Sequence, residues 1–144
     1  MQNNGADATK SLFQSIQSMS VSEKLDLARK ANKEARSILM RDSNKLVQIA
    51  VISSPKITEG EVLLIAGNRQ INDEVLRHIA NNREWMKNYQ IKLALVNNPK
   101  TPLPLALRQV SYLKQRDLEL LAKSRAIPRP IVIVAQQRLK EVKR

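Results

Sequence analysis

Cysteine is absent from this chain of 144 residues, and glycine and aromatic residues are scarce. Without cysteine, the chain can form no disulfide bond, no thiolate metal site and no cysteine nucleophile. Only 3 glycines occur, and aromatic residues make up 3% of the chain, which weighs against a stacking platform for single-stranded nucleic acid. Leucine, alanine, lysine, arginine and glutamine are plentiful instead, and this balance favours helix over sheet.

Long apolar runs are also missing. Ile131–Ala135 is among the longest, and it falls far short of the roughly 20 residues that a membrane-spanning helix requires. The first residues, Met1–Asp7, lack the basic and then apolar order of a signal peptide. We therefore expect a cytoplasmic protein, and 144 residues suffice for one domain with its own core.

Negative charge is scarce in the last third of the chain. The net charge is +12, and residues 89–144 carry 12 basic and 3 acidic side chains, whereas residues 46–88 carry 5 of each. Such an excess attracts anionic partners: an acidic protein surface, nucleic acid or anionic lipid. The alternative is that the charge serves solubility, with a basic C-terminal tail made of Arg138, Lys140, Lys143 and Arg144.

The chain contains an internal echo at a spacing of 44 residues. Val47–Lys56 aligns with Ile91–Lys100, with identical alanine, proline and lysine positions and similar residues between them. A repeat of this length with helical patterning is typical of stacked helical repeats, which usually bind partners through a surface. A second, shorter echo relates Thr101–Leu107 to Ile127–Ile133 through a shared Pro-x-Pro motif.

Apolar spacing, capping residues and prolines predict a series of short helices. Ser20–Glu23 and Thr58–Glu61 are capping-box patterns, and Ser43 or Asp42 can cap the helix that follows them. Ile131–Ala135 could instead be a strand, but no other segment offers a partner strand. Helices are predicted at about residues 9–19, 21–31, 32–41, 44–52, 59–66, 73–80, 83–96, 102–113, 115–124 and 129–139.

The motif Val96–Pro102, which reads Val-Asn-Asn-Pro-Lys-Thr-Pro, resembles the Asn-Pro turns of α-helical repeat proteins. Over about residues 43–140 the chain is similar to HEAT-like repeats and to the leucine-rich repeat variant family. This resemblance implies an all-α, right-handed α-solenoid of about eight to ten short stacked helices, used for binding. The prototype of that variant family carries a cysteine-ligated iron–sulfur module, which cannot be carried over to a chain without cysteine.

Residues 33–140 also resemble a group of uncharacterised bacterial proteins, from which no function is carried over. Together these features predict a disordered segment at 1–8, a single helical-repeat domain at 9–140 and a basic tail at 141–144. The clearest repeats lie at 43–140.

Catalytic patterns are weak. His78 is the single histidine and follows Glu74 by four residues, a spacing that can belong to a catalytic or metal site, but a lone histidine is more often a surface or boundary residue. Glu59, Glu61 and Asp73 fall in the first turns of predicted helices, where the helix dipole explains them without catalysis. We therefore expect neither an enzyme nor a cofactor or metal site.

An aromatic and basic patch is one candidate site. Trp85, Tyr89 and Lys92 share a helical stripe, and Arg108 and Tyr112 on a later helix could line the same groove. If Trp85 and Tyr89 are exposed, they form a binding patch. If they are buried, they fill the space between two repeats, and this second interpretation is preferred for Trp85.

A basic strip along the C-terminal repeats is the sharper hypothesis, because equivalent positions of consecutive repeats line up on one surface. Between the two copies of the 44-residue echo, Gln48 is replaced by Lys92 and Leu64 by Arg108. The predicted partner-binding residues are Lys92, Lys100, Arg108, Lys114, Arg116, Lys123, Arg125 and Arg129, with Trp85, Tyr89 and Tyr112 as aromatic contacts.

We thus expect a non-enzymatic adaptor or scaffold that presents a basic surface to an acidic protein segment. The alternative is sequence-tolerant binding of a nucleic-acid backbone through the same strip. A second copy of the chain could cover a terminal apolar face of the helical stack, so the sequence also allows a homodimer.

Overall fold

The computed structural model describes residues 4–142, with side chains described from residue 10 to residue 141. Ten α-helices and one 3₁₀-helix make up this part of the chain, and it contains no strand. The all-α class and the number of short helices are therefore confirmed. Residues 131–135, for which a strand was the alternative, lie inside a helix.

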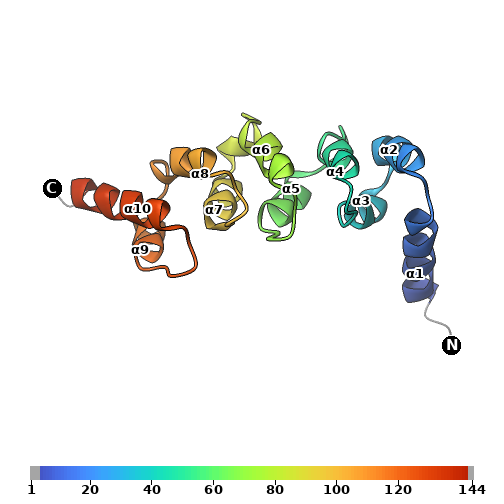
Figure 1. Ribbon diagram of the computed structural model, residues 1–144, viewed down its shortest axis with the longest axis horizontal. Coiled ribbons are helices and arrows are strands. Elements are labelled where there is room, and N and C mark those ends of the chain that lie inside the picture. The colour runs from blue at the N-terminus through green and yellow to red at the C-terminus, as the bar shows by residue number, and fades with distance from the viewer. Residues whose placement is uncertain (1–3, 143–144) are drawn as a thin grey trace. The chain divides into compact units, whose positions relative to one another are not determined.

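The contacts between Cα atoms divide the chain into two compact units, unit 1 (Met1–Thr58) and unit 2 (Glu59–Arg144). The single repeat domain at 9–140 and its right-handed solenoid stay predictions. Unit 1 contains α1 (Asn4–Gln17), α2 (Val21–Lys30), α3 (Lys33–Leu39) and α4 (Lys45–Ile52) (Figure 1). Within it, α2 packs against α4, α3 contacts both of them, and α1 packs against α3.

Polar caps start two of the helices of unit 1 where the sequence predicts them. The Ser20 hydroxyl accepts a hydrogen bond from the Glu23 N–H at 3.1 Å, and the Glu23 carboxylate accepts one from the Ser20 N–H at 3.1 Å. The backbone N–H of Ser20, and then its hydroxyl group, hold the pKa of Glu23 below its usual range. Asn32 caps α3 by accepting a hydrogen bond from the Ala35 N–H. These bonds satisfy donors that the first turn of a helix leaves unpaired.

The start of α4 differs from the prediction. Neither Ser43 nor Asp42 caps this helix; Asn44 does, by accepting a hydrogen bond from the Leu46 N–H at 2.8 Å. The Asp42 carboxylate instead accepts a hydrogen bond from the Asn44 N–H at 2.8 Å. The Asp42 carboxylate is also engaged by Lys24, and Asn44 directly precedes the first residue of α4, so its side chain is the one placed to reach the first turn.

The N-terminal boundary also differs. The helix α1 begins at Asn4, so residues 4–8 of the segment predicted to be disordered are helical, and residues 1–3 lie outside the described residues. At the other end, residues 141–142 of the predicted basic tail belong to the last helix, and residues 143–144 lie outside the described residues.

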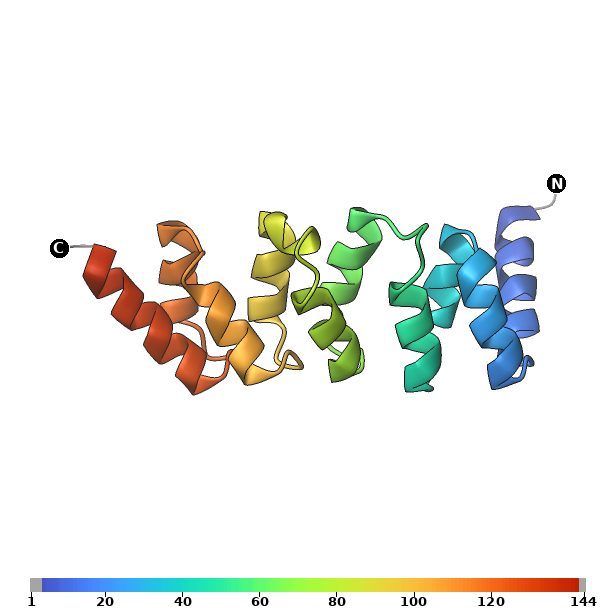
Figure 2. The same cartoon turned by 90° about the horizontal axis from the view of Figure 1, so that it is seen from above.

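Unit 2 holds the remaining helices. They are α5 (Glu59–Ala66), α6 (Asp73–Ala80), the 3₁₀-helix η1 (Trp85–Lys87), α7 (Tyr89–Asn97), α8 (Leu103–Val110), α9 (Gln115–Ala122) and α10 (Arg129–Val142). Helices α9 and α10 lie side by side in both views, and α10 also packs against α8 (Figure 2). The core of this part is formed by Val96, Ala106, Val110, Leu113, Leu118, Leu121, Ile127, Ile131, Val132 and Ala135.

The long helix predicted at about residues 83–96 is broken. The 3₁₀-helix η1 comes first, and α7 begins only at Tyr89, because the Asn88 side chain accepts hydrogen bonds from the N–H groups of Gln90 and Ile91. A further asparagine, Asn82, accepts a hydrogen bond from the Trp85 N–H. Periodicity alone missed this break because it does not weigh an asparagine that competes for backbone N–H groups.

Secondary structure and burial recur at the spacing of the sequence echo. The helices α4 and α7 begin 44 residues apart, as do α5 and α8. Val47 and Val51 are buried in α4, and Ile91 and Leu95 are buried at the matching positions of α7. The two prolines that follow α4 and α7, at positions 55 and 99, are both exposed. The echo is therefore a feature of local structure as well as of sequence.

Candidate interaction surface

Two lysines of unit 2 lie over two tyrosine rings. Tyr89 and Lys92 lie three residues apart on α7, and Tyr112 and Lys114 lie on the turn between α8 and α9. The Lys92 Nζ atom is 4.9 Å from the centroid of the Tyr112 ring, and the Lys114 Nζ atom is 4.7 Å from that of the Tyr89 ring. Both distances fit cation–π interactions. We call these four residues the Lys–Tyr cluster.

Hydrogen bonds fix one half of the Lys–Tyr cluster. The Tyr89 hydroxyl donates to the Asp117 carboxylate at 2.5 Å and accepts from the Lys114 N–H at 2.9 Å. Burial raises the pKa of Tyr89, and the hydrogen bond to Asp117 raises it further, so the phenol keeps its proton and remains a donor. This role of Asp117 has no local signal in the sequence, since its partner lies 28 residues away.

Arg108 is exposed in the last turn of α8, and Tyr112 lies two residues past the end of that helix. Tyr112 is 63% exposed, so its ring can be reached from solvent. Of the groove residues predicted from sequence, the structure thus brings Lys92 and Tyr112 into contact.

Trp85 lies elsewhere. It is half-buried in η1, and its ring centroid is 6.5 Å from that of the His78 imidazole, which is exposed on α6. Glu74, the possible partner of His78, forms a long ion pair with Arg77 at 4.0 Å. Among the described residues, no group of three or more histidine, aspartate or glutamate side chains could hold a metal ion. Trp85 is therefore only partly buried, and it is not part of the Lys–Tyr cluster.

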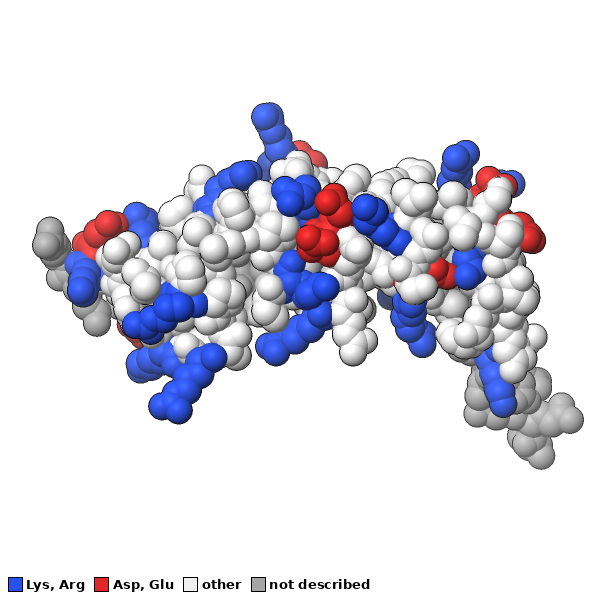
Figure 3. All heavy atoms as spheres, viewed as in Figure 1, with Lys and Arg blue, Asp and Glu red and all other residues white. Residues whose placement is uncertain are grey.

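The other predicted cations occupy exposed positions on turns and helix ends. Lys100 lies between α7 and α8, Arg116 in the first turn of α9, Lys123 and Arg125 after α9, and Arg129 at the start of α10. On the face shown in Figure 3, the basic side chains of unit 2 project in separate groups with uncharged surface between them.

The charge of the predicted cations is not neutralised locally. Within the described part of the chain, the ion pairs join Lys24 to Asp42, Arg77 to Glu74, Lys87 to Glu84 and Arg138 to Glu141. None of these pairs includes one of the eight predicted cations. The eight positive charges are thus available to an anionic partner.

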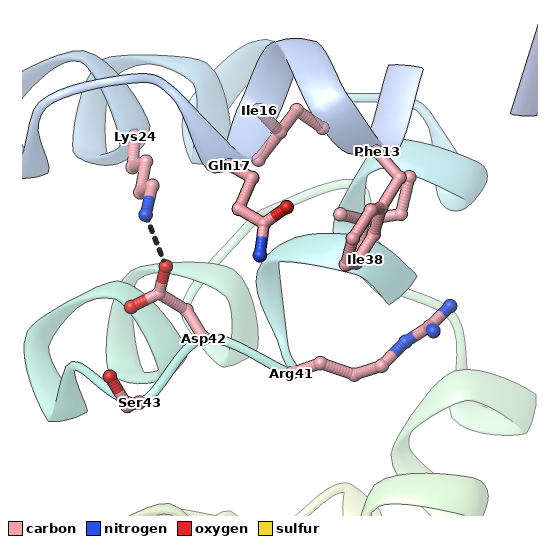
Figure 4. Close-up of a pocket in the computed structure, with 8 residues that line it drawn as sticks. All are labelled: Phe13, Ile16, Gln17, Lys24, Ile38, Arg41, Asp42 and Ser43. Carbon is pink, nitrogen blue, oxygen red and sulfur yellow. Dashed lines mark hydrogen bonds and ion pairs between the residues drawn. The ribbon is translucent and has the colours of Figure 1, made fainter. Parts of the chain in front are cut away.

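Unit 1 contains a surface pocket of about 420 Å³, shown in Figure 4. It is lined by Phe13, Ile16, Gln17, Lys24, Ile38, Arg41, Asp42 and Ser43. Gln17 lies between the Lys24–Asp42 pair on one side and the rings and methyl groups of Phe13 and Ile38 on the other. The Arg41 guanidinium is 5.9 Å from the centroid of the Phe13 ring.

The charged groups of this pocket serve the fold. The Lys24 Nζ atom is 2.6 Å from the Asp42 carboxylate, and the two side chains are only 13% and 15% exposed. Burial raises the pKa of Asp42, but the hydrogen bond from Lys24, the N–H of Asn44 and the positive charge of Lys24 together bring it below its usual range. Because the Asp42 carboxylate already binds Lys24 and the Asn44 N–H, it is not free to bind a ligand in this pocket.

Comparison of the chain with protein-family models, with curated proteins and with solved structures finds no match. No helix of the described residues is both long and apolar enough to cross a bilayer. The function is therefore argued from the geometry of the Lys–Tyr cluster and from the charges around it.

Proposed function

We propose that this protein is a non-enzymatic adaptor that binds an acidic protein segment through unit 2. The observation that carries the proposal is the Lys–Tyr cluster, in which Lys92 and Lys114 lie over the rings of Tyr112 and Tyr89. A lysine held over an aromatic ring loses less side-chain entropy on binding than a freely rotating one. The cluster is therefore preorganised to meet carboxylates, and Tyr112 adds an exposed aromatic surface beside them.

We further propose that the helices form a right-handed α-solenoid of HEAT-like type. The recurrence of helix starts and buried positions at 44 residues, in α4 and α5 and again in α7 and α8, supports this architecture. In such a solenoid, consecutive repeats present equivalent surfaces, so a partner can contact more than one repeat.

Binding to a nucleic-acid backbone is the second candidate. It is favoured by the eight cations of unit 2 that form no ion pair with a described carboxylate. Phosphate contacts would give an affinity that is tolerant of sequence and steeply dependent on salt.

A charge-reversal experiment tests the proposal. The double variant Lys92→Glu/Lys114→Glu is compared with wild type for binding of a fluorescent glutamate-rich peptide and of a 20-base-pair duplex DNA, at two salt concentrations. We expect the variant to bind the peptide at least about tenfold more weakly, a loss of about 1.4 kcal/mol. Lys87→Glu is the control, because Lys87 is exposed in η1 and pairs only with Glu84.

The outcomes separate the candidates. Equal peptide affinity of wild type and the double variant would overturn the role of the cluster. Strong DNA binding with no measurable peptide binding would replace the acidic protein segment by nucleic acid.

A further inference from the structure

Helix α9 and the residue that directly follows it carry a stripe of two cations and one leucine on the outer side of the helix. Arg116, Leu120 and Lys123 follow one another at spacings of four and three residues, which places them on one face. All three are exposed, and Leu120 is 64% exposed. We call these three residues the α9 stripe.

The opposite face of α9 holds the helix in place. Leu118 and Leu121 are 3% and 2% exposed and belong to the core that α9 shares with α10. The turn before α9 is fixed by the hydrogen bond from the Lys114 N–H to the Tyr89 hydroxyl. The α9 stripe is therefore presented on a helix whose position within unit 2 is determined by packing.

The carboxylates of α9 have other partners. Asp117 accepts the hydrogen bond of the Tyr89 hydroxyl, and Glu119 accepts one from the Gln115 side chain at 3.1 Å. Neither forms an ion pair with Arg116 or Lys123. Both cations of the α9 stripe can therefore pair with an anionic group of another molecule.

A second leucine shows that exposure alone does not create this arrangement. Leu64 on α5 is 74% exposed, but the residues three and four positions away are Gly60, Glu61, Gly67 and Asn68, none of which is a cation. The combination of an exposed leucine with cations on both sides belongs to the α9 stripe. Such a pattern suits a partner that has an apolar side chain between two acidic ones.

We propose that the α9 stripe docks an acidic amphipathic helix of a partner protein. An apolar side chain of that helix packs on Leu120, and carboxylates before and after it pair with Arg116 and Lys123. These two cations are seven residues apart, or about 10 Å along α9, so acidic residues at the same spacing on the partner helix match them. This inference rests on the proposed function, and it names the form of the acidic segment.

Charge favours this occupant over a second copy of the chain. Residues 89–144 carry 12 basic and 3 acidic side chains, so two copies facing each other through α9 would repel. A partner with an acidic face gains the complementary interaction.

The test uses two 18-residue peptides of identical leucine and glutamate composition. In the first peptide, the leucines lie on one face of the helix, and glutamates seven residues apart flank that face. In the second peptide, the same residues stand in a scrambled order. We expect wild type to prefer the amphipathic peptide, and Leu120→Ala to weaken its binding about tenfold because the apolar anchor is lost. The matched control is Leu64→Ala, at a leucine that is somewhat more exposed than Leu120, and it should keep the wild-type affinity for the amphipathic peptide. The Leu120→Ala variant should bind the scrambled peptide as wild type does.

The outcomes distinguish this inference from the proposed function. If Leu120→Ala binds both peptides as wild type does while Lys92→Glu/Lys114→Glu loses them, the proposed function stands and the α9 stripe is overturned as a docking site. If wild type binds neither peptide, both proposals are overturned. If phosphatidylserine vesicles bind through Leu120 and the peptides do not bind at all, a lipid surface replaces the protein partner.

Discussion

The two units of the chain hold their helices together with different chemistry. In unit 1, an ion pair between Lys24 and Asp42 joins α2 to the connection between α3 and α4. In unit 2, the neutral side chain of Asn98 joins the end of α7 to the α5–α6 connection by donating to the carbonyl oxygens of Ala66 and Asn68 at 2.8 and 2.9 Å. An ion pair thus makes this connection in unit 1, and a neutral amide makes it in unit 2.

The same contrast occurs at the helix ends. In unit 1, the Arg36 guanidinium, 5% exposed, donates to the Ala31 carbonyl oxygen at 2.6 Å. In unit 2, the Thr101 hydroxyl donates to the Leu95 carbonyl oxygen at 2.7 Å. Both bonds add a side-chain donor to a carbonyl group at a helix end, one from a charged side chain and one from a neutral side chain; the Leu95 carbonyl also accepts from the Asn98 N–H at 3.2 Å. Charged donors thus make these two bonds in unit 1, and neutral donors make the corresponding two bonds in unit 2.

The largest effect is expected for Asn98→Ala. Asn98 is 3% exposed, and its removal takes the side-chain donor away from the buried Ala66 carbonyl and leaves the Asn68 carbonyl with only the Ile71 N–H at 3.4 Å, at a cost of about 3 kcal/mol of unfolding free energy. Ser54, at the matching position after α4, is also buried, and its hydroxyl accepts a hydrogen bond from the nearby Lys56 N–H. Ser54→Ala should cost about 1 kcal/mol or less. Urea unfolding measures both; equal losses would show that the two joints do not differ.

The next effect concerns the ionic joint of unit 1. Asp42→Ala leaves Lys24 without its partner at a position that is only 13% exposed, and it should cost about 2 kcal/mol. The control is Glu74→Ala in unit 2, whose pair with Arg77 is about half exposed and should contribute about 0.5 kcal/mol or less. Hydrogen exchange should locate the loss in α2 and α4. A larger loss from the Glu74 variant would reverse the comparison.

A smaller effect is expected for Tyr89→Phe. This change removes the bonds of the hydroxyl group to Asp117 and to the Lys114 N–H but keeps the ring under the Lys114 ammonium, so it should cost about 1 kcal/mol. Tyr112→Phe, at a 63% exposed position, should change stability by less than about 0.5 kcal/mol. Thermal unfolding of the two variants checks this, and an unchanged Tyr89→Phe would mean that the hydroxyl bonds do not hold the turn before α9.

The smallest effect is the dependence on pH, which should have opposite directions in the two units. The pKa of Asp42 is lowered in the folded protein, so its contribution is present above about pH 4 and is lost as the pH falls through the folded value. The pKa of Tyr89 is raised, so its contribution is present below about pH 10 and is lost as the pH rises through the folded value.

Hydrogen exchange can follow both limits. Acid should first increase exchange in α2 and α4 of unit 1, and alkali should first increase it in α7 and α9 of unit 2, after correction for the intrinsic rate. In the Asp42→Ala variant the acid-dependent increase in unit 1 should become smaller, and the part that remains is expected from Glu23, whose pKa is also lowered in the folded protein. Loss of protection in both units at the same pH would contradict the assignment of the acid limit to Asp42 in unit 1 and of the alkaline limit to Tyr89 in unit 2.

Local patterns in the sequence predicted several elements well. The box at Ser20 and Glu23 was confirmed because both hydrogen bonds lie within four consecutive residues. Apolar spacing likewise predicted a helix at about residues 73–80, and α6 spans Asp73–Ala80 with Val75 and Ile79 fully buried. The break at Asn88 was missed, since an asparagine inside a periodic run can cap a new helix or continue the old one.

The candidate site was only partly predictable. Lys92 and Tyr112 were expected to line one groove, and they are in contact. Trp85 was expected beside them and instead lies near His78, because the break before α7 removes it from the helical stripe. The pairing of Tyr89 with Asp117 has no local signal, since it joins side chains 28 residues apart.

The sequence by itself determined the helical class, the capping box at Ser20 and Glu23, the recurrence at 44 residues and the excess of positive charge after residue 88. These depend on neighbours within a few residues or on composition, which the order of residues contains directly. Only the tertiary structure decided which cations are engaged and which are not: Lys24 and Arg36 are bound internally, whereas Arg116 and Lys123 are not paired with any described carboxylate. The physical reason is that an ion pair or a side-chain hydrogen bond requires a partner within a few ångströms, and packing, not sequence distance, supplies that partner.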